Sequence, residues 1–280
     1  MKTNSISADL AVHARTITTT RHLIFHHACL WTGLLAFAMT AFGPRPAQAA
    51  VTEAWVHRFS NVVSNVTDEA VKVVRDAAGD IIVTGSTAGG LPGAADMLTI
   101  KYSGADGSVL WQQRYNGPAN GDDFAKAVAV DGSGNVVVTG VSQERESGFT
   151  ESYTAKYAAT DGALLWERRG PDEPYYEPFP AKLAVDGNGN VVVTGSSGGD
   201  YYTAKYAAAD GALLWEKRYG AANSYDYPKA VAVDGNGNVV VTGSSGGDYY
   251  TAKYASADGG LLWEKRFTGP GSGFYRIVQP

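Results

Sequence analysis

Carboxylates and aromatic side chains are the residues of this chain that could do chemistry, and they cluster in a few short segments. Paired carboxylates can act as acid and base in glycoside hydrolysis, and the candidates are Asp122, Asp123, Asp172, Glu173, Glu177 and Asp226. Aromatic residues that could contact a sugar or a protein stand among them, at Tyr175, Tyr176, Phe179, Tyr225 and Tyr227. The spacing does not show whether two carboxylates face one another. We therefore interpret these segments as binding loops and expect no catalytic pair.

Histidine and cysteine chemistry is scarce beyond the first 49 residues. Four of the five histidines and the single cysteine, Cys29, lie within residues 1–49. A Ser-His-Asp triad needs a histidine base, and only His57 remains. Lys217 and Lys265 occupy the matching position in similar segments, so we expect His57 to be exposed. The sequence predicts no cysteine-based metal site and a protein that is not an enzyme.

The segment Asp186-Gly187-Asn188-Gly189-Asn190 places oxygen-bearing side chains at alternate positions, as the first half of a calcium loop does. Its sixth position is not glycine and its twelfth is not glutamate, so the rest of that pattern is missing. A tight hairpin turn favours the same residues, because Gly and Asn adopt a positive φ at low cost. We predict a turn and no cofactor here, with bound calcium as the alternative.

Four copies of one sequence pattern fill most of the chain. The phrase Val-Asp-Gly-x-Gly-Asn-Val-Val-Val-Thr-Gly occurs three times, and a diverged copy precedes these; their aspartates are Asp76, Asp131, Asp186 and Asp234. Each copy continues with Thr-x-Lys-Tyr and ends near a tryptophan, at Trp111, Trp166, Trp215 and Trp263. Residues 184–207 are identical to residues 232–255. A recurring pattern of this length is typical of repeat architectures.

Each copy is predicted to form four short strands, named A to D in chain order. In the second copy they are 127–130, 136–139, 153–157 and 164–168, rich in β-branched or aromatic residues and bounded by Gly, Asn or Asp. No helical period of apolar residues is present beyond residue 49, so we expect an all-β fold. Four antiparallel strands per repeat predict a β-propeller of about four blades plus a partial one, with closure of the ring left open. A β-solenoid is the alternative architecture.

Lysines on strand C and arginines on strand D recur from copy to copy. Glutamates stand nearby on strand D, at Glu167, Glu216 and Glu264. We predict ordinary cross-strand ion pairs between these glutamates and the basic residues, each contributing little to stability; the basic residues are Lys156, Lys205, Lys253, Arg169, Arg218 and Arg266.

The copies resemble a bacterial β-propeller repeat called SBBP. The phrase Asp-Gly-x-Leu-Leu-Trp-Glu at 210–216 and 258–264 is also similar to the tryptophan-bearing repeat of quinoprotein dehydrogenase propellers. The resemblance covers about residues 51–278 and rests on turn and packing residues, so it implies an architecture. It also raises, as the alternative function, a quinoprotein-like or carbohydrate-active propeller enzyme. Quinoprotein propellers usually have more blades, a calcium and often a vicinal cysteine pair, and this chain has no cysteine beyond residue 49.

Residues 1–49 are predicted to be a secretory signal peptide. They combine basic residues, an apolar run from Ala28 to Gly43 and the small-x-small sequence Ala47-Gln48-Ala49. The run is short for a bilayer span of roughly 20 residues, so we expect cleavage after Ala49 rather than a membrane anchor. The protein is then secreted, periplasmic or at the cell surface. The repeat domain is predicted at 50–280, with a strand at 51–59, copies at about 60–117, 118–170, 171–220 and 221–269, and a partial copy at 270–280.

Beyond residue 49 the chain is acidic. Of its 23 basic and 28 acidic residues, four and one lie within residues 1–49, which leaves 19 and 27 and a net charge of −8. This charge repels phosphate backbones, so we expect no nucleic-acid partner. After cleavage of the leader, no membrane span is expected either.

Length differences among the copies concentrate at one end of the predicted blades. The B–C loops and the connectors between copies differ in length, whereas the A–B and C–D turns are short and uniform. Repeat proteins often bind their partners through such variable faces. We therefore predict an exported, non-catalytic propeller scaffold that binds a protein or polysaccharide through Tyr175, Tyr176, Phe179, Tyr225, Tyr227, Asp122, Asp123 and Asp226. A truncated propeller without activity of its own is a further alternative.

Overall fold

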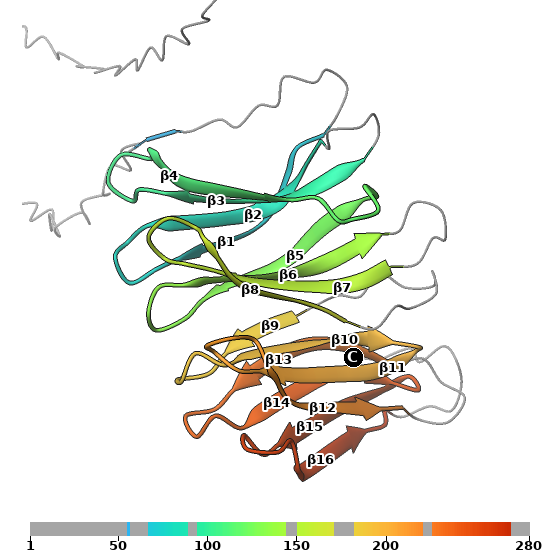
Figure 1. Ribbon diagram of the computed structural model, residues 1–280. Coiled ribbons are helices and arrows are strands. Elements are labelled where there is room, and N and C mark those ends of the chain that lie inside the picture. The colour runs from blue at the N-terminus through green and yellow to red at the C-terminus, as the bar shows by residue number, and fades with distance from the viewer. Residues whose placement is uncertain are drawn as a thin grey trace, which may run out of the picture. The chain divides into compact units, whose positions relative to one another are not determined.

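The computed structural model describes residues 55–56, 67–88, 94–143, 150–170, 182–220 and 226–269. All of these lie within the unit Thr52–Pro280. They form sixteen strands arranged in four antiparallel four-stranded sheets, and none of them is helical (Figure 1). The predicted all-β fold of four-stranded blades is therefore confirmed. No helix that could cross a membrane occurs in this part of the chain.

Each sheet, called a blade below, contains four consecutive strands that pair in chain order. Blade 1 contains β1 (Glu69–Arg75), β2 (Ile81–Ala88), β3 (Ala95–Tyr102) and β4 (Val109–Tyr115). Blade 2 contains β5 (Asp123–Val130), β6 (Val136–Gln143), β7 (Thr150–Tyr157) and β8 (Leu164–Arg169). Blade 3 contains β9 (Lys182–Val185), β10 (Val191–Ser197), β11 (Asp200–Tyr206) and β12 (Leu213–Tyr219). Blade 4 contains β13 (Asp226–Val233), β14 (Val239–Ser245), β15 (Asp248–Tyr254) and β16 (Leu261–Phe267).

Two tight turns connect the strands of each blade at one end. In blade 2 the Asp131 N–H donates to the Asn135 carbonyl at 2.9 Å, which closes the turn between β5 and β6. Gly134 in this turn has a φ of 83°, and Gly162 in the turn between β7 and β8 has a φ of 71°. Both values lie in the left-handed region, which glycine adopts without steric cost. The turns predicted from the Asp-Gly-x-Gly-Asn and Asp-Gly phrases are thus confirmed.

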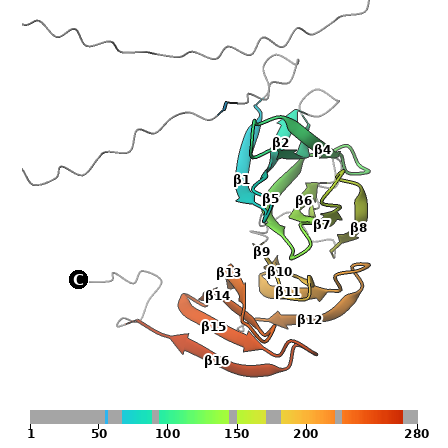
Figure 2. The ribbon, with the colours of Figure 1, turned by 90° about the vertical axis from the view of Figure 1, so that its left-hand side faces the viewer.

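Neighbouring blades pack against one another through their sheet faces. Ile82, Met97 and Trp111 of blade 1 share one core cluster with Tyr153 of blade 2. A Cβ on Gly162 would lie 2.8 Å from the Trp111 ring, so only glycine lets this tryptophan approach the turn. The first strands of successive blades, β1, β5, β9 and β13, also contact one another, and Figure 2 shows them at the edge of their sheets opposite β4, β8, β12 and β16.

Candidate functional site

The turns and loops of each blade lie at two opposite ends. The A–B and C–D turns meet at one end, where the Ala159 N–H donates to the Asn135 side-chain carbonyl at 3.2 Å in blade 2. We call this the turn end. The described loops between the second and third strands, at 198–199 and 246–247, and the described connector at 116–122 lie at the opposite end, which we call the loop end. Among the described residues, the uniform turns and these segments therefore lie at opposite ends of the blades.

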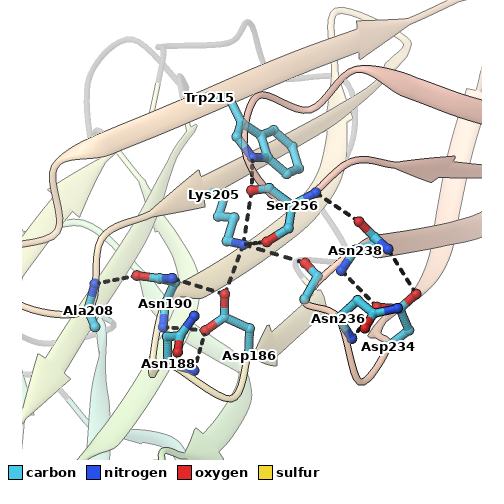
Figure 3. A network of polar contacts seen from close by, with 11 residues as sticks. Asp186, Asn188, Asn190, Lys205, Ala208, Trp215, Asp234, Asn236, Asn238 and Ser256 are labelled. Atoms are coloured by element: carbon cyan, nitrogen blue, oxygen red, sulfur yellow. Dashed lines mark hydrogen bonds and ion pairs between the residues drawn. The ribbon is translucent and has the colours of Figure 1, made fainter.

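A buried polar network occupies the turn end of blade 3 (Figure 3). Asp186 Oδ1 accepts the Asn190 N–H at 2.9 Å, and Asp186 Oδ2 lies 2.8 Å from the Lys205 ammonium group. Lys205 also donates to the Ser256 hydroxyl of blade 4 at 2.8 Å. The Trp215 indole N–H donates to the Ser256 carbonyl at 3.1 Å. The network therefore ties a charged pair of one blade to a turn of the next.

The same arrangement recurs in blades 1 and 2. Lys101 lies 2.8 Å from Asp76, and Lys156 lies 2.8 Å from Asp131. The indole N–H groups of their tryptophans donate to carbonyl groups in the turn of the following blade, those of Ala159 and Ala208, and both distances are 3.2 Å. We call this lysine–aspartate–tryptophan contact the blade clamp.

The prediction of weak glutamate pairs for the strand C lysines is wrong. Lys156 and Lys205 are buried and pair with turn aspartates. The glutamates accept hydrogen bonds from tyrosines instead, as Glu167 does from Tyr153 at 2.9 Å. The physical reason is the strand register: Lys156 lies opposite Trp166, whereas Glu167 lies opposite Ala155, so the lysine and the glutamate are on opposite faces of the sheet. Lys253 pairs with Asp234 in the same way.

The geometry of Asp186 does not fit a calcium ion. Both of its carboxylate oxygens accept hydrogen bonds within the turn, and the Lys205 ammonium group beside it would repel a divalent cation. Burial raises the pKa of Asp186, but the hydrogen bonds from Lys205 and Asn190 outweigh burial, and its pKa lies below the ordinary value. Within the described residues, no group of three His, Cys, Asp or Glu side chains could hold a metal.

The loop end carries pairs between an arginine of the fourth strand and an acid of the third. The pairs are Arg114–Asp96 at 2.6 Å, Arg169–Glu151 at 2.8 Å and Arg266–Asp248 at 3.2 Å. The arginine side chains are 41%, 32% and 35% exposed, while the acids are more buried. The loop end therefore presents guanidinium groups to solvent, each held in place by a carboxylate below it.

Sequence reasoning missed these arginine–acid pairs, although a signal for them is present. The acid stands three positions before each Thr-x-Lys-Tyr phrase, and the arginine stands three positions after each tryptophan. Antiparallel pairing of the third and fourth strands brings the two close together, as the register of Lys156 opposite Trp166 requires. The repeat phrases alone thus locate the pairs once the strand register is known.

Asp122 and Asp123 lie at the loop end where blade 1 connects to blade 2. Asp122 Oδ1 accepts the Ala95 N–H at 2.9 Å, which fastens the connector to blade 1. Asp123 is fully buried, and its Oδ2 accepts the Gly117 N–H at 2.6 Å. Burial raises the pKa of Asp123 to about 6; the Gly117 N–H counteracts this in part, and the charge of Asp96 adds to it. Asp123 therefore holds the connector through its hydrogen bond with the Gly117 backbone and does not face solvent.

Asp226 and Tyr227 begin the first strand of blade 4. Asp226 is fully buried, and its N–H donates to the Gly199 carbonyl at 2.6 Å. Tyr227 is half-buried, with the Lys229 ammonium group 5.4 Å from its ring centroid. Asp226 and Asp123 therefore lie inside separate blades. The other predicted binding residues, Tyr175, Tyr176, Phe179 and Tyr225, lie outside the described residues, as do Asp172, Glu173, Glu177 and His57.

Several solved structures are similar to parts of this chain, each with a TM-score below 0.5. BamB from Moraxella catarrhalis is 18% identical, with 71% of this chain and 52% of that chain covered and a TM-score of 0.41. The Dos1 propeller is 12% identical, with 74% and 50% covered and a TM-score of 0.49. Virginiamycin B lyase from Staphylococcus aureus is 11% identical, with 72% and 56% covered and a TM-score of 0.42. The chain thus spans about half the length of these solved structures. No curated protein sequence matches it.

A family model also matches the chain directly in sequence. The model is described as outer membrane protein assembly factor BamB, and the match covers residues 77–274, from blade 1 to beyond blade 4. This confirms the predicted likeness to quinoprotein-type propellers in its broad form, while the finer resemblance to SBBP repeats stays a prediction. Since the match extends over more than half of the sequence, the chain belongs to the family of BamB-like β-propellers.

Proposed function

We propose that this protein is an exported, non-catalytic propeller scaffold that binds a protein partner through the loop end of its blades. The observation that carries the proposal is the contrast between the two ends. At the turn end, the lysine and aspartate of each interior blade pair with one another in the blade clamp. At the loop end, the arginines are partly exposed and the connectors differ from blade to blade.

The chemistry of the loop end favours a protein surface that offers carboxylates to its arginines. Arg114 and Arg169 each expose part of a guanidinium group that a carboxylate already orients, which lowers the entropy cost of a new hydrogen bond. Arginine is also enriched among the residues that dominate protein interfaces. The family description names an assembly factor, which supports a protein partner. Binding of a polysaccharide to the tyrosine-bearing connectors would instead identify a glycan as the ligand.

Site-specific photo-crosslinking tests the binding face. A benzophenone side chain would replace Asp122 at the loop end, and, as the matched control, exposed Ser133 at the turn end. The expected result is protein adducts from position 122 in intact cells and none from position 133. Equal adducts at both positions, or binding to a glycan array in the absence of adducts, would contradict a protein-binding loop end. Turnover of a glycoside that Asp122→Asn abolishes would contradict the non-catalytic part.

Export is tested separately from binding. The full chain, expressed with its own leader in a bacterium, is expected outside the cytoplasm with Ala50 as its first residue. The family description names the outer membrane, and the leader combines basic residues, an apolar run and an Ala-x-Ala end. N-terminal sequencing that finds residues 1–49 still attached would remove export from the proposal.

A further inference from the structure

Two identical sequence segments have very different surroundings in this structure. Residues 184–207 of blade 3 repeat in blade 4 as residues 232–255, so Tyr201 corresponds to Tyr249. Tyr201 is 1% exposed, whereas Tyr249 is 71% exposed. Trp215 is 6% exposed, and its counterpart Trp263 is 42% exposed. The difference arises because blade 4 packs on this face of blade 3, whereas none of the described residues packs on the same face of blade 4.

The open surface of blade 4 is called its back face, and it consists of Val240, Tyr249, Lys253, Trp263 and Phe267. Every residue of β16 is exposed. Tyr249 and Phe267 lie together, with ring centroids 6.3 Å apart. Large exposed apolar residues gathered on one sheet face are typical of an interaction surface.

The interfaces inside the chain show what covers such a face. Trp215 donates to the Ser256 carbonyl, and a Cβ on Gly259 would lie 2.8 Å from the Trp215 ring. The Tyr201 hydroxyl would lie 2.5 Å from a Cβ on Gly243. The cover is therefore the opposite face of another blade, which presents a turn carbonyl to the tryptophan and a strand glycine to the tyrosine.

The sheet face of blade 1 that points away from blade 2 is of this covering type. We call it the front face. A groove of about 330 Å³ lies there, lined by residues of β1, β2 and β3 that include Val83, Gly85, Leu98 and Ile100. Gly85 corresponds to Gly243, the glycine against which Tyr201 packs in blade 4. The groove is thus the place where a preceding blade would insert a tyrosine or methionine.

We propose that the back face of blade 4 docks on the front face of blade 1 of a second copy of this chain, with Tyr249 in the groove beside Gly85. The occupant follows from the internal interfaces, because a front face of the same repeat covers the back faces of blades 1, 2 and 3. The contact is heterologous, since different faces of the two copies meet. It uses sheet faces and not the loop end, so its failure would leave the proposed function untouched.

Trp55 already occupies part of the front face. A Cβ on Gly107 would lie 2.5 Å from the Trp55 ring, so Trp55 lies against blade 1 as Trp215 lies against Gly259 of blade 4. Trp263 of an incoming copy would need the same place. Docking therefore displaces Trp55, which acts within its own chain as a competitor for the contact.

Analytical ultracentrifugation of the purified protein, with one negative charge introduced on each face, tests the contact. Tyr249→Glu alters the back face, and Val73→Glu alters the front face, where Val73 is 59% exposed. Leu213→Glu, at a 51% exposed site on β12 of the interior blade 3, is the matched control. The wild type and Leu213→Glu are expected to associate as concentration rises, and each face variant is expected to bind at least tenfold more weakly.

Mixing the two face variants separates a head-to-tail contact from a back-to-back one. The Val73→Glu protein keeps an intact back face, and the Tyr249→Glu protein keeps an intact front face, so the mixture should form a one-to-one dimer that grows no further. Trp55→Ala is expected to tighten association of the otherwise unchanged protein. A monomeric wild type, a Val73→Glu protein that associates normally, a mixture that stays monomeric, or a Trp55→Ala protein that associates more weakly would overturn the proposal.

Discussion

The Lys205 ammonium group lies 2.8 Å from the Asp186 carboxylate, and both side chains are only 1% exposed. Burying two charges costs desolvation free energy, which the pair regains only where further hydrogen bonds satisfy both groups. Here Asn190 donates to the carboxylate, and Ser256 of the next blade accepts from the ammonium group. The pair is therefore complete only when two blades are packed together.

Lys205→Met is expected to destabilise the protein strongly. The substitution keeps the length of the side chain but leaves the Asp186 carboxylate buried without its cation, and breaking one partner of a buried pair costs about 3–5 kcal/mol. Urea unfolding followed by tryptophan fluorescence measures the loss. Lys253→Met is the matched control, because Lys253 and Asp234 are 23% and 27% exposed, and its loss is expected to be much smaller. Equal losses would contradict the role assigned to burial.

Trp215→Ala is expected to cost about 3–5 kcal/mol, the range for truncating a large buried aromatic residue. The indole is 6% exposed, packs on Gly259 and donates to the Ser256 carbonyl, so its loss opens a cavity and leaves the acceptor without that donor. Trp263→Ala removes the same side chain at a 42% exposed site and should cost distinctly less. Thermal unfolding of the two variants side by side measures the difference.

The sequence predicts the four-stranded blades well because their turns carry local chemistry. Asp-Gly-x-Gly-Asn determines a turn by its own φ preferences and by hydrogen bonds that Asp131 makes within five residues. The burial of Lys156 is different, since it depends on the packing of blade 3 against blade 2, which neighbours along the strand do not reveal. The same sequence pattern is compatible with exposed cross-strand ion pairs and with the buried blade clamp. The loop-end arginine pairs lie within single blades, and locating them needed the register of the third and fourth strands.

Chelation of metals is expected to leave the melting temperature unchanged. The oxygens of Asp186 and Asp131 accept hydrogen bonds within their turns and pair with lysines, so these loops have no carboxylate to offer a cation. A metal that bound the native state would raise apparent stability with the logarithm of its free concentration relative to Kd. Differential scanning fluorimetry with EDTA, followed by addition of calcium, makes the comparison. A drop in melting temperature that calcium reverses would show a metal site that this geometry does not provide.

Asp123→Asn is expected to change how stability depends on pH. Asp123 is fully buried, and burial raises its pKa from 3.8 to about 6 in the folded protein. Between these two values the folded state holds a proton that the unfolded state has released, so the free energy of unfolding falls as pH rises. The contribution of the neutral carboxyl is complete below about pH 4 and is lost above about pH 6, and a shift of about two units corresponds to about 3 kcal/mol.

Asparagine can keep the hydrogen bond from the Gly117 N–H without a proton to lose. Urea unfolding of the unchanged protein at a series of pH values from about 4 to about 7, which spans this transition, should therefore show a decline that is shallower in Asp123→Asn. At the upper end of the series the variant should equal or exceed the unchanged protein in stability, because no buried carboxylate remains beside Asp96. Parallel pH profiles for the two proteins would mean that Asp123 titrates near its ordinary value and that the connector is open to water.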